Sequence, residues 1–164
     1  MTTAREPATV AVEPIDGPES AALLWAYWTE LTSRHLGRDA TEAEVTATAA
    51  EYTSPHLVPP GGAWLVLRMA GRVVGGIGLR ELAPGVGEVK HMFVVPDARR
   101  RGIGRQLMLA VEEEARRRGL GTLRLDTRRD LVEARALYAS EGYAEIPAFT
   151  RGEYVDHWFE KHLG

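Results

Sequence analysis

The sequence predicts an α/β fold in a single domain, with an antiparallel meander of strands at its centre. Strand-like and helix-like spacings of apolar residues alternate in the order β-α-α-β-β-β-α-β-α-β-β. The three central strand-like runs are separated by only a few residues, which is typical of antiparallel neighbours. The length of 164 residues is that of about one domain. We therefore expect a flexible N-terminal tail over residues 1–8 and one domain over residues 9–164.

The N-terminal third is expected to hold one strand and two helices. Val10–Ile15 has the pattern of a short strand, and apolar residues spaced three and four apart predict a helix over Ser20–His35. A second helix is expected to begin at Thr41. Thr41 and Glu44 have the spacing of a capping box, in which each side chain satisfies the other residue's backbone N–H. Prolines and glycines between residues 55 and 62 then end the helical region.

The middle of the chain supplies the meander and the helix that follows it. Its strands are expected over Ala63–Met69, Arg72–Leu82 and Gly87–Val95. Pro96 ends the third strand, and Gly104–Arg118 has the pattern of an amphipathic helix. The outer face of this helix carries three acid-first pairs at i,i+4 spacing, which are Glu112–Arg116, Glu113–Arg117 and Glu114–Arg118.

The C-terminal third continues the alternation of strand and helix patterns. A strand is expected over Leu123–Thr127 and a helix over Val132–Glu141, which ends at Gly142. The last strands are expected over Tyr143–Ile146 and His157–His162.

Composition excludes several classes of protein and site. Cysteine is absent, which excludes disulfides, thiol catalysis and cysteine-ligated metal centres. His157 and His162 lie five residues apart without an H-E-x-x-H motif, so no metal site is expected. The N-terminus is polar and carries Glu6, and the longest apolar stretches are strand-sized. We therefore expect no signal peptide, no membrane association and a cytoplasmic location.

The net charge of −3 conceals a strong asymmetry along the chain. Between Arg99 and Arg135, eleven arginines stand against six acidic residues, a net charge of +5, which leaves −8 for the remainder. A basic block within an acidic protein favours an anionic small-molecule ligand over a nucleic acid. Helix-surface pairing accounts for Arg116–Arg118, so the arginines of interest are Arg99–Arg101 and Arg105.

The segment Val94–Arg105 joins a strand end to a helix start and places two glycines among these arginines. A helix N-terminus has unpaired N–H groups and a partial positive charge, and glycines let the backbone approach a ligand closely. Together they predict a phosphate or pyrophosphate cradle. The alternative is that Gly102 and Gly104 only tighten the turn. Two other phosphate-binding motifs do not match this segment. A Walker loop requires a lysine that is absent here, and a dinucleotide-binding fingerprint requires glycine at the position of Leu107.

Two motifs resemble those of the GNAT family of N-acetyltransferases. Arg99-x-x-Gly102-x-Gly104, after a hydrophobic strand, is similar to the family signature Gln/Arg-x-x-Gly-x-Gly/Ala. The second motif, A-x-x-L-Y-x-x-x-G-F/Y, is matched over Ala134–Tyr143. The resemblance covers roughly residues 8–163, and the C-terminal part resembles a branch of small bacterial members. It implies the GNAT fold, a mixed and mostly antiparallel twisted sheet flanked by helices.

The resemblance also implies that the protein binds acetyl-CoA. The pyrophosphate is expected on the backbone N–H groups of Arg100–Arg105, and the pantetheine arm is expected along the splayed end of the fourth strand. The implied cofactor-binding residues are Met92, Phe93, Val94, Arg99, Arg100, Arg101, Gly102, Ile103, Gly104 and Arg105.

Glu88 is the candidate general base. It lies 11 residues before Arg99, the spacing at which many family members carry a base glutamate. An amine is protonated near neutral pH and must lose a proton before it attacks a thioester, which a positioned carboxylate accepts directly or through water. The alternative is an outward strand glutamate paired with Lys90. His91 is the rival base, although in a regular strand it points to the face opposite Glu88.

Tyr138 is the candidate general acid. The resemblance implies that its phenol protonates the departing thiolate, and a phenol is a suitable donor. The alternative is a helix tyrosine packed in the core. The backbone N–H of Val94 is expected to polarise the thioester oxygen.

Some positions depart from the family pattern or allow two interpretations. Leu131 stands where many members have asparagine, which leaves one cofactor contact open, and Asp126 stands where the similar branch often has glutamate. Several aromatic residues either border the acceptor cleft or belong to the core, namely Trp25, Tyr27, Trp28, Tyr154 and Trp158.

The preferred function is acetyl transfer from acetyl-CoA to a primary amine of a small molecule or peptide by direct attack. A non-catalytic domain that binds or senses acyl-CoA is the alternative, and a nucleic-acid module is disfavoured by the acidic remainder of the chain. The amine itself is open among polyamines, amino acids, antibiotics, peptide N-termini and protein lysines. The oligomeric state is also open, although homodimers are common among similar proteins.

Overall fold

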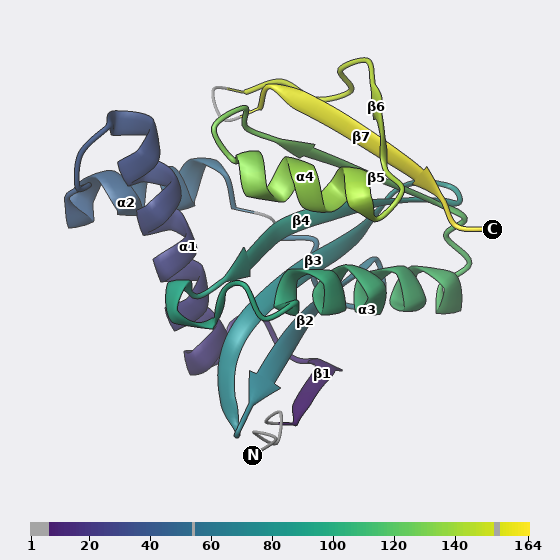
Figure 1. Ribbon diagram of the computed structural model, residues 1–164, viewed down its shortest axis with the longest axis horizontal. Helices are drawn as coiled ribbons and strands as arrows, with labels where there is room; N and C mark the ends of the chain where they lie inside the picture. The colour runs from purple at the N-terminus through teal and green to yellow at the C-terminus, as the bar shows by residue number, and fades with distance from the viewer. Residues whose placement is uncertain (1–6, 54, 153–154) are drawn as a thin grey trace.

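The computed structural model describes residues 7–53, 55–152 and 155–164, which form one twisted sheet flanked by helices (Figure 1). Within these residues the strand order is β1-β2-β3-β4-β5-β7-β6. The elements in chain order are β1 (Ala8–Val12), α1 (Pro18–Leu36), α2 (Glu42–Glu51), β2 (Gly62–Met69), β3 (Arg72–Ala83), β4 (Val86–Val94), a short 3-10 helix (Pro96–Ala98), α3 (Ile103–Arg117), β5 (Thr122–Thr127), α4 (Val132–Ser140), β6 (Ala144–Ile146) and β7 (His157–His162).

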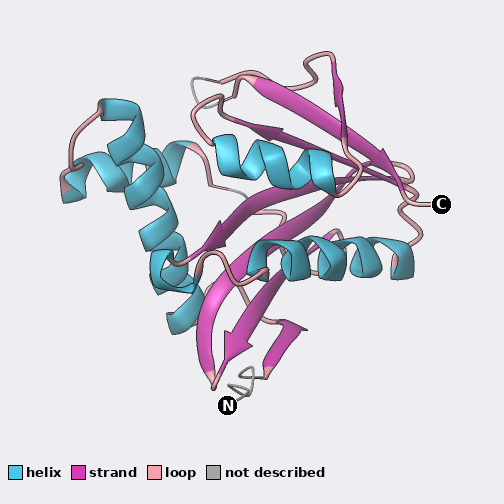
Figure 2. Ribbon diagram, in the orientation of Figure 1, coloured by secondary structure: helices cyan, strands magenta, loops and turns pink. Residues whose placement is uncertain are grey.

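The two faces of the sheet carry separate apolar cores, because strand side chains alternate between faces. Leu65 and Leu67 of β2 belong to the core beneath α3, whereas Trp64 and Val66 belong to the core beneath α1, with Leu23. Helix α3 packs on β2, β3 and β4, and α1 packs on β3 and β4. Figure 2 shows the helices in cyan on the two sides of the magenta strands.

The predicted α/β fold with its antiparallel meander is confirmed, and most element bounds agree within one or two residues. The first strand differs, because β1 runs over Ala8–Val12 instead of the predicted 10–15. It ends early because Pro14 cannot donate to the ladder and α1 begins at Pro18. Most of the expected N-terminal tail lies outside the described residues, and Ala8 is already part of the sheet.

The capping box at the start of α2 is confirmed. The backbone N–H of Glu44 donates to Thr41 Oγ1 at 3.2 Å, and the N–H of Thr41 donates to Glu44 Oε2 at 3.1 Å. Two of the N–H groups that a helix start leaves unpaired are thereby satisfied.

The ion pairs predicted along α3 form only in part. Glu114 accepts from Arg118 Nε at 2.8 Å, as predicted. The predicted pairing of Glu112 with Arg116 is wrong, because Glu112 is 2% exposed and faces β7 instead of solvent. The remaining arginines pair at i,i+3 spacing, which is the other neighbouring position on a helix surface.

Strands β4 and β5 run parallel, and they pair over only three residue pairs, Val86–Thr122, Gly87–Leu123 and Glu88–Arg124. Beyond Glu88 the strands diverge, as their arrowheads in Figure 1 show. Strand β5 remains paired with β7 along its whole length, while β4 remains paired with β3. The divergence therefore opens the middle of the sheet and leaves the β5-facing edge of Val89–Val94 without a strand partner among the described residues.

Candidate active site

A groove of about 720 Å³ extends from the end of β4 to the N-terminus of α3. Every predicted cofactor-binding residue except Arg101 lines it, and Arg101 is exposed. The rest of the lining comes from α1, from α4 and from two residues outside these helices, and it consists of Tyr27, Glu30, Leu31, Arg34, Pro96, Leu131, Glu133, Ala134 and Leu137. Among these residues, Leu131 is the position at which the sequence left one cofactor contact open.

The loop before α3 has the backbone geometry of an anion site. Arg100 (φ +64°) and Gly102 (φ +75°) are both left-handed, a combination that turns successive N–H groups toward one concave side. No side chain caps the helix, and its first backbone bond within the helix runs from Gln106 N–H to the carbonyl of Gly102 at 3.1 Å. The N–H groups of Ile103–Arg105 are therefore those that a helix start leaves for a ligand.

Gly104 is required for a different reason. A Cβ atom at this position would lie 3.0 Å from Leu137 Cδ2, so the missing side chain lets α4 approach the start of α3 closely. The alternative that both glycines only tighten the turn therefore does not describe Gly104, which packs against α4.

Arg99 links helix α1 to the end of strand β4. Its guanidinium donates to both carboxylate oxygens of Glu30 at 2.9 and 2.7 Å, and its Nε donates to the carbonyl of Val94 at 2.9 Å. The same group lies 5.4 Å from the ring centre of Phe93. Arg99 thus fastens α1 to the end of β4, and Arg105 is paired with Glu141 at 3.0 Å. The prediction that these arginines contact the cofactor remains untested.

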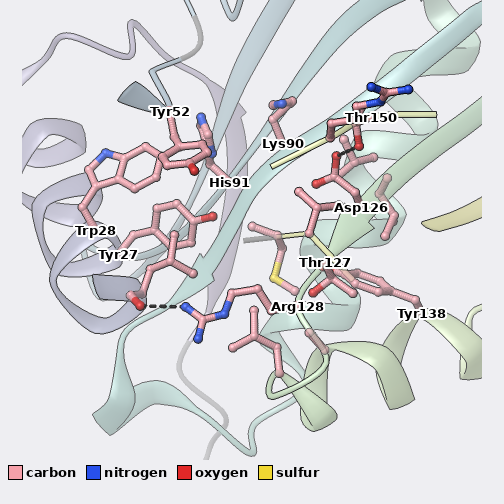
Figure 3. Close-up of a pocket in the computed structure, with 18 residues that line it drawn as sticks. Tyr27, Trp28, Tyr52, Lys90, His91, Asp126, Thr127, Arg128, Tyr138 and Thr150 are labelled. Atoms are coloured by element: carbon pink, nitrogen blue, oxygen red, sulfur yellow. Dashed lines mark hydrogen bonds between the residues drawn. The ribbon is translucent and has the colours of Figure 1, made fainter. Parts of the chain in front are cut away.

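A second cavity, of about 230 Å³, lies where β4 and β5 diverge. It shares Tyr27, Leu31, Met92, Leu131 and Ala134 with the groove, so the two spaces meet at the end of β4. Figure 3 shows aromatic side chains of α1 with Tyr52 and His91 on one side of the cavity, and Asp126 with Thr150 on the other. The arrangement suits a long ligand in the groove and a small one in the cavity.

Glu88 lies next to the cavity without lining it, whereas its neighbours Val89 and Lys90 do line it. The carboxylate is 1% exposed, and its Oε1 accepts from Arg80 Nε at 2.7 Å and lies 3.5 Å from Lys90 Nζ. Its Oε2 has no hydrogen-bond partner among the described residues. The alternative of an outward strand glutamate paired with Lys90 holds only in part, because Lys90 is a neighbour but the carboxylate is buried. The role of Glu88 as base remains a prediction.

His91 lies at a bulge in β4, where three residue steps from Lys90 to Phe93 face two steps from Gly78 to Gly76 on β3. Its φ of +56° is in the left-handed region, which is uncommon for a residue other than glycine. In a regular strand His91 would point to the face opposite Glu88 and Lys90. This expectation is wrong, because His91 and Lys90 line the same cavity.

The imidazole of His91 packs against the aromatic rings of α1. Its ring centre lies 4.9 Å from Trp28 and 5.5 Å from Tyr27, and its Nε2 has no partner among the described residues. Burial, with a smaller effect of Lys90, lowers the pKa of His91 from 6.5 to about 3. The ring is therefore neutral at physiological pH.

This buried imidazole leads to a prediction about stability in acid. Between about pH 6.5 and pH 3 the unfolded chain binds a proton at His91 that the folded protein excludes, so stability falls as the pH falls through this range. We expect His91→Asn, which tolerates a left-handed φ, to reduce this fall by up to about 1.4 kcal/mol per pH unit. Urea unfolding between about pH 7 and pH 5 measures the slope. An unchanged slope would show that the folded protein protonates His91 readily.

Tyr138 is packed in the core and also lines the cavity, and its role as general acid remains a prediction. It is 6% exposed, and its ring centre lies 5.9 Å from Phe159 and 6.2 Å from Tyr143 in the core. It also lines the cavity, as Figure 3 shows. Burial raises the pKa of its phenol far above the ordinary value, so the group remains a proton donor at all physiological pH values.

Sequence reasoning missed the polar wall of the cavity on β5 and the loop before β7. Asp126 Oδ2 accepts from Thr150 Oγ1 at 2.7 Å, and Thr150 Oγ1 accepts in turn from Trp158 Nε1 at 2.7 Å. Burial raises the pKa of Asp126 above its ordinary value. A strand ending in Leu-Asp-Thr offered a weak signal for Asp126, but nothing in the loop sequence pointed to Thr150.

The structure shows which of the aromatic residues named in the sequence analysis line the cavity and which do not. Tyr27 and Trp28 line the cavity as well as packing in the core, whereas Trp25 is 43% exposed and lines neither space. Trp158 is half-buried and supports Thr150. Tyr154 lies outside the described residues.

The part of the chain that the structure describes contains neither a metal-binding group nor a membrane-spanning helix. No three histidine, aspartate or glutamate side chains there are grouped so as to hold a metal ion. No helix there combines the length and apolar character that a membrane span requires.

Comparison with known proteins agrees with this geometry. The model of the acetyltransferase (GNAT) family matches residues 21–143. An IAA acetyltransferase from Azospirillum brasilense is 43% identical over 94 residues, which are 57% of this chain and 61% of that protein. The chain thus matches less than two thirds of this curated relative's length.

Solved structures share the whole fold. A provisionally assigned acyl-CoA N-acyltransferase from Klebsiella pneumoniae has a TM-score of 0.74 and 26% identity, covering 96% of this chain and 98% of that one. The PaiA N-acetyltransferase from Thermoplasma acidophilum, solved in complex with coenzyme A, has a TM-score of 0.70 and 18% identity, covering 95% and 99% of the two chains.

Proposed function

This chain belongs to the acetyltransferase (GNAT) family, and from that membership we propose that it transfers the acetyl group of acetyl-CoA to a primary amine of a small molecule or peptide. The observation that carries the proposal is the divergence of β4 and β5, which joins a groove ending at an uncapped helix start to a small cavity. A coenzyme A complex of a protein with the same fold supports the choice of acyl donor.

The residues present fit acetyl-CoA. The N–H groups of Ile103–Arg105 and the side chain of Arg100 are suited to the pyrophosphate. The free edge of β4 at Met92–Val94 offers backbone groups to the amides of the pantetheine arm, in place of a strand partner. A ligand held in this way directs its thioester end toward the cavity, where Tyr138 lies.

The amine must first lose a proton, because an ammonium nitrogen has no lone pair to attack with. We assign this step to Glu88, whose Oε1 lies against Arg80 and Lys90 and whose Oε2 has no hydrogen-bond partner among the described residues. The carboxylate does not line the cavity, so the proton reaches it through a water molecule.

The neutral amine then attacks the thioester carbonyl carbon, a C–N bond forms, and the carbonyl π electrons move to oxygen. When the carbonyl re-forms, the C–S bond breaks with its electron pair on sulfur, the nitrogen loses its second proton, and the sulfur receives a proton from Tyr138, which is then reprotonated. The products are the N-acetyl amine, the free thiol of CoA and one proton released to solvent. A backbone N–H at Val94 is the proposed donor to the oxyanion.

The proposal predicts thermal stabilisation by either form of the cofactor, together with transfer. At a concentration of 100 Kd, acetyl-CoA or CoA should stabilise the protein by about 2.7 kcal/mol and raise its Tm by about 5–10 °C. Differential scanning fluorimetry measures the shift, and thiol release with a panel of amines measures transfer. Absence of any Tm shift would refute the proposal. A shift without transfer to any amine would favour the alternative of a domain that senses acyl-CoA.

A further inference from the structure

The cavity where β4 and β5 diverge contains two cations that already have a carboxylate neighbour. Arg128 is buried, and its guanidinium donates to both carboxylate oxygens of Asp130 at 2.8 and 2.6 Å and to the carbonyl of Leu31 at 2.8 Å. Lys90 Nζ lies 3.5 Å from Glu88 Oε1. Arg128 therefore has a carboxylate of its own, whereas Lys90 shares the carboxylate of Glu88 with Arg80.

The two other charged residues that line the cavity, Asp126 and Arg151, differ from these two cations. Asp126 is half-buried and accepts from the Thr150 hydroxyl, but it forms no ion pair with any described residue. Arg151 is exposed although it lines the cavity, which places it at the mouth, and it too has no ion pair within the described ranges. Lys90 and Arg80 attract Asp126 and Glu88 repels it, but neither cation forms an ion pair with Asp126. A partly buried carboxylate in this position is suited to direct contact with the ammonium group of a ligand.

The rest of the cavity is apolar and small. One wall is made of the rings of Tyr27, Trp28 and Tyr52, with the neutral ring of His91 beside them (Figure 3). The ring centres of Tyr27 and Trp28 are 4.7 Å apart, so they form one continuous aromatic surface. The volume of about 230 Å³ is below the range of about 300–1,000 Å³ that is typical of pockets for drug-sized ligands.

We propose that the acceptor is a free amino acid with an aromatic or other apolar side chain, held by its ammonium group at Asp126 and by its carboxylate at Arg151. Its side chain then packs against the rings of Tyr27, Trp28 and Tyr52. The two consecutive hydrogen bonds from Trp158 to Thr150 and from Thr150 to Asp126 orient the carboxylate that receives the amine. This inference rests on the proposed acetyl transfer and specifies its acceptor.

The same lining disfavours other amines. A diamine or polyamine needs a second anionic partner, and Asp126 is the sole acidic residue among the described residues that line the cavity. A simple monoamine would leave Arg151 without a partner.

Four probes separate the contributions of the charged groups. L-phenylalanine carries all three recognised features, phenethylamine lacks the carboxylate, 3-phenylpropanoate lacks the amine, and putrescine is a diamine without an aromatic group. We expect kcat/KM for L-phenylalanine to exceed that for phenethylamine and for putrescine by at least about 10-fold, the value of one charged hydrogen bond. In the presence of CoA, calorimetry should show that L-phenylalanine binds at least about 10-fold more tightly than 3-phenylpropanoate.

Variants test the two contacts separately. Arg151→Gln should raise KM for L-phenylalanine about 10-fold or more and leave KM for phenethylamine unchanged. Asp126→Asn should raise KM for both amines, with a smaller change in kcat. Arg129→Gln is the matched control, because Arg129 is an exposed arginine near the cavity that does not line it, and its KM values should equal those of the wild type.

The outcomes distinguish this inference from the proposed function. Efficient transfer to phenethylamine or putrescine without a preference for L-phenylalanine would overturn the inference and leave acetyl transfer intact. An equal rise in KM for both amines in Arg151→Gln would also overturn it. If no amine is acetylated and L-phenylalanine does not bind in calorimetry, both proposals fail.

Discussion

Replacing Glu88 with glutamine should lower kcat by about 10²–10⁴-fold at neutral pH, the range that general base catalysis contributes. The amide keeps the size of the side chain and a hydrogen-bonding oxygen for Arg80, but it cannot accept a proton from the amine. The loss should shrink at high pH, because a larger fraction of the free amine is then already deprotonated. Steady-state kinetics over a range of pH values, with CoA release as the readout, measure both effects.

Controls separate a lost base from a lost fold or a lost cofactor. The Tm shift with CoA should be retained in Glu88→Gln, because the groove is built by β4, α3 and α4 without this side chain. Asp126→Asn should have a different kinetic effect from Glu88→Gln, because it should raise KM more than it lowers kcat. A Glu88→Gln variant with wild-type kcat at all pH values would remove Glu88 from the mechanism and leave it as the buried partner of Arg80 and Lys90.

Replacing Lys161 with methionine should destabilise the protein by about 3 kcal/mol, the lower end of the cost of breaking a buried ion pair. Lys161 Nζ donates to Glu112 Oε1 at 2.7 Å, and the Tyr143 hydroxyl donates to the same oxygen at 3.2 Å. Glu112 is 2% exposed, so its carboxylate would be left buried with only a phenol as partner. The expected fall in Tm is about 6–12 °C.

A double variant tests whether the loss comes from the orphaned charge. Lys161→Met combined with Glu112→Gln removes both charges and should recover part of the stability, because two neutral groups cost less to bury than one unpaired ion. Urea unfolding of the wild type, both single variants and the double variant completes the cycle. Additive losses in the double variant would contradict a direct interaction between the two side chains.

These contacts show how far local patterns reach in this molecule. Glu112 sits in a run of glutamates followed by arginines, a pattern that correctly predicts a helix but wrongly predicts that Glu112 faces solvent. Its partners Lys161 and Tyr143 are remote in sequence, and they meet it only because β7 and α4 bring the C-terminal part of the chain against α3. Arg99 was found through its motif, but its bond to Glu30 depends on how α1 packs.

The residues that line the proposed cofactor groove were predicted far better than those that line the proposed acceptor cavity. The groove is formed largely by consecutive residues of one strand, one loop and one helix start, so its geometry follows from local backbone conformation. The cavity collects residues from six separate segments, among them those of Tyr52, His91, Asp126 and Thr150. Alternation in a regular strand placed His91 on the wrong face, because the bulge in β4 has no local signature.

By itself the sequence determined the kind and order of the elements, the capping box of α2 and the loop before α3. These features depend on apolar periodicity, turn residues and helix starts, which are properties of neighbouring residues. Only the tertiary structure decided where β4 and β5 diverge, which side chains line the cavity and which charge partners each arginine and carboxylate finds. The physical reason is that strand register, the bulge and helix packing are set by contacts between distant segments, which no local spacing encodes.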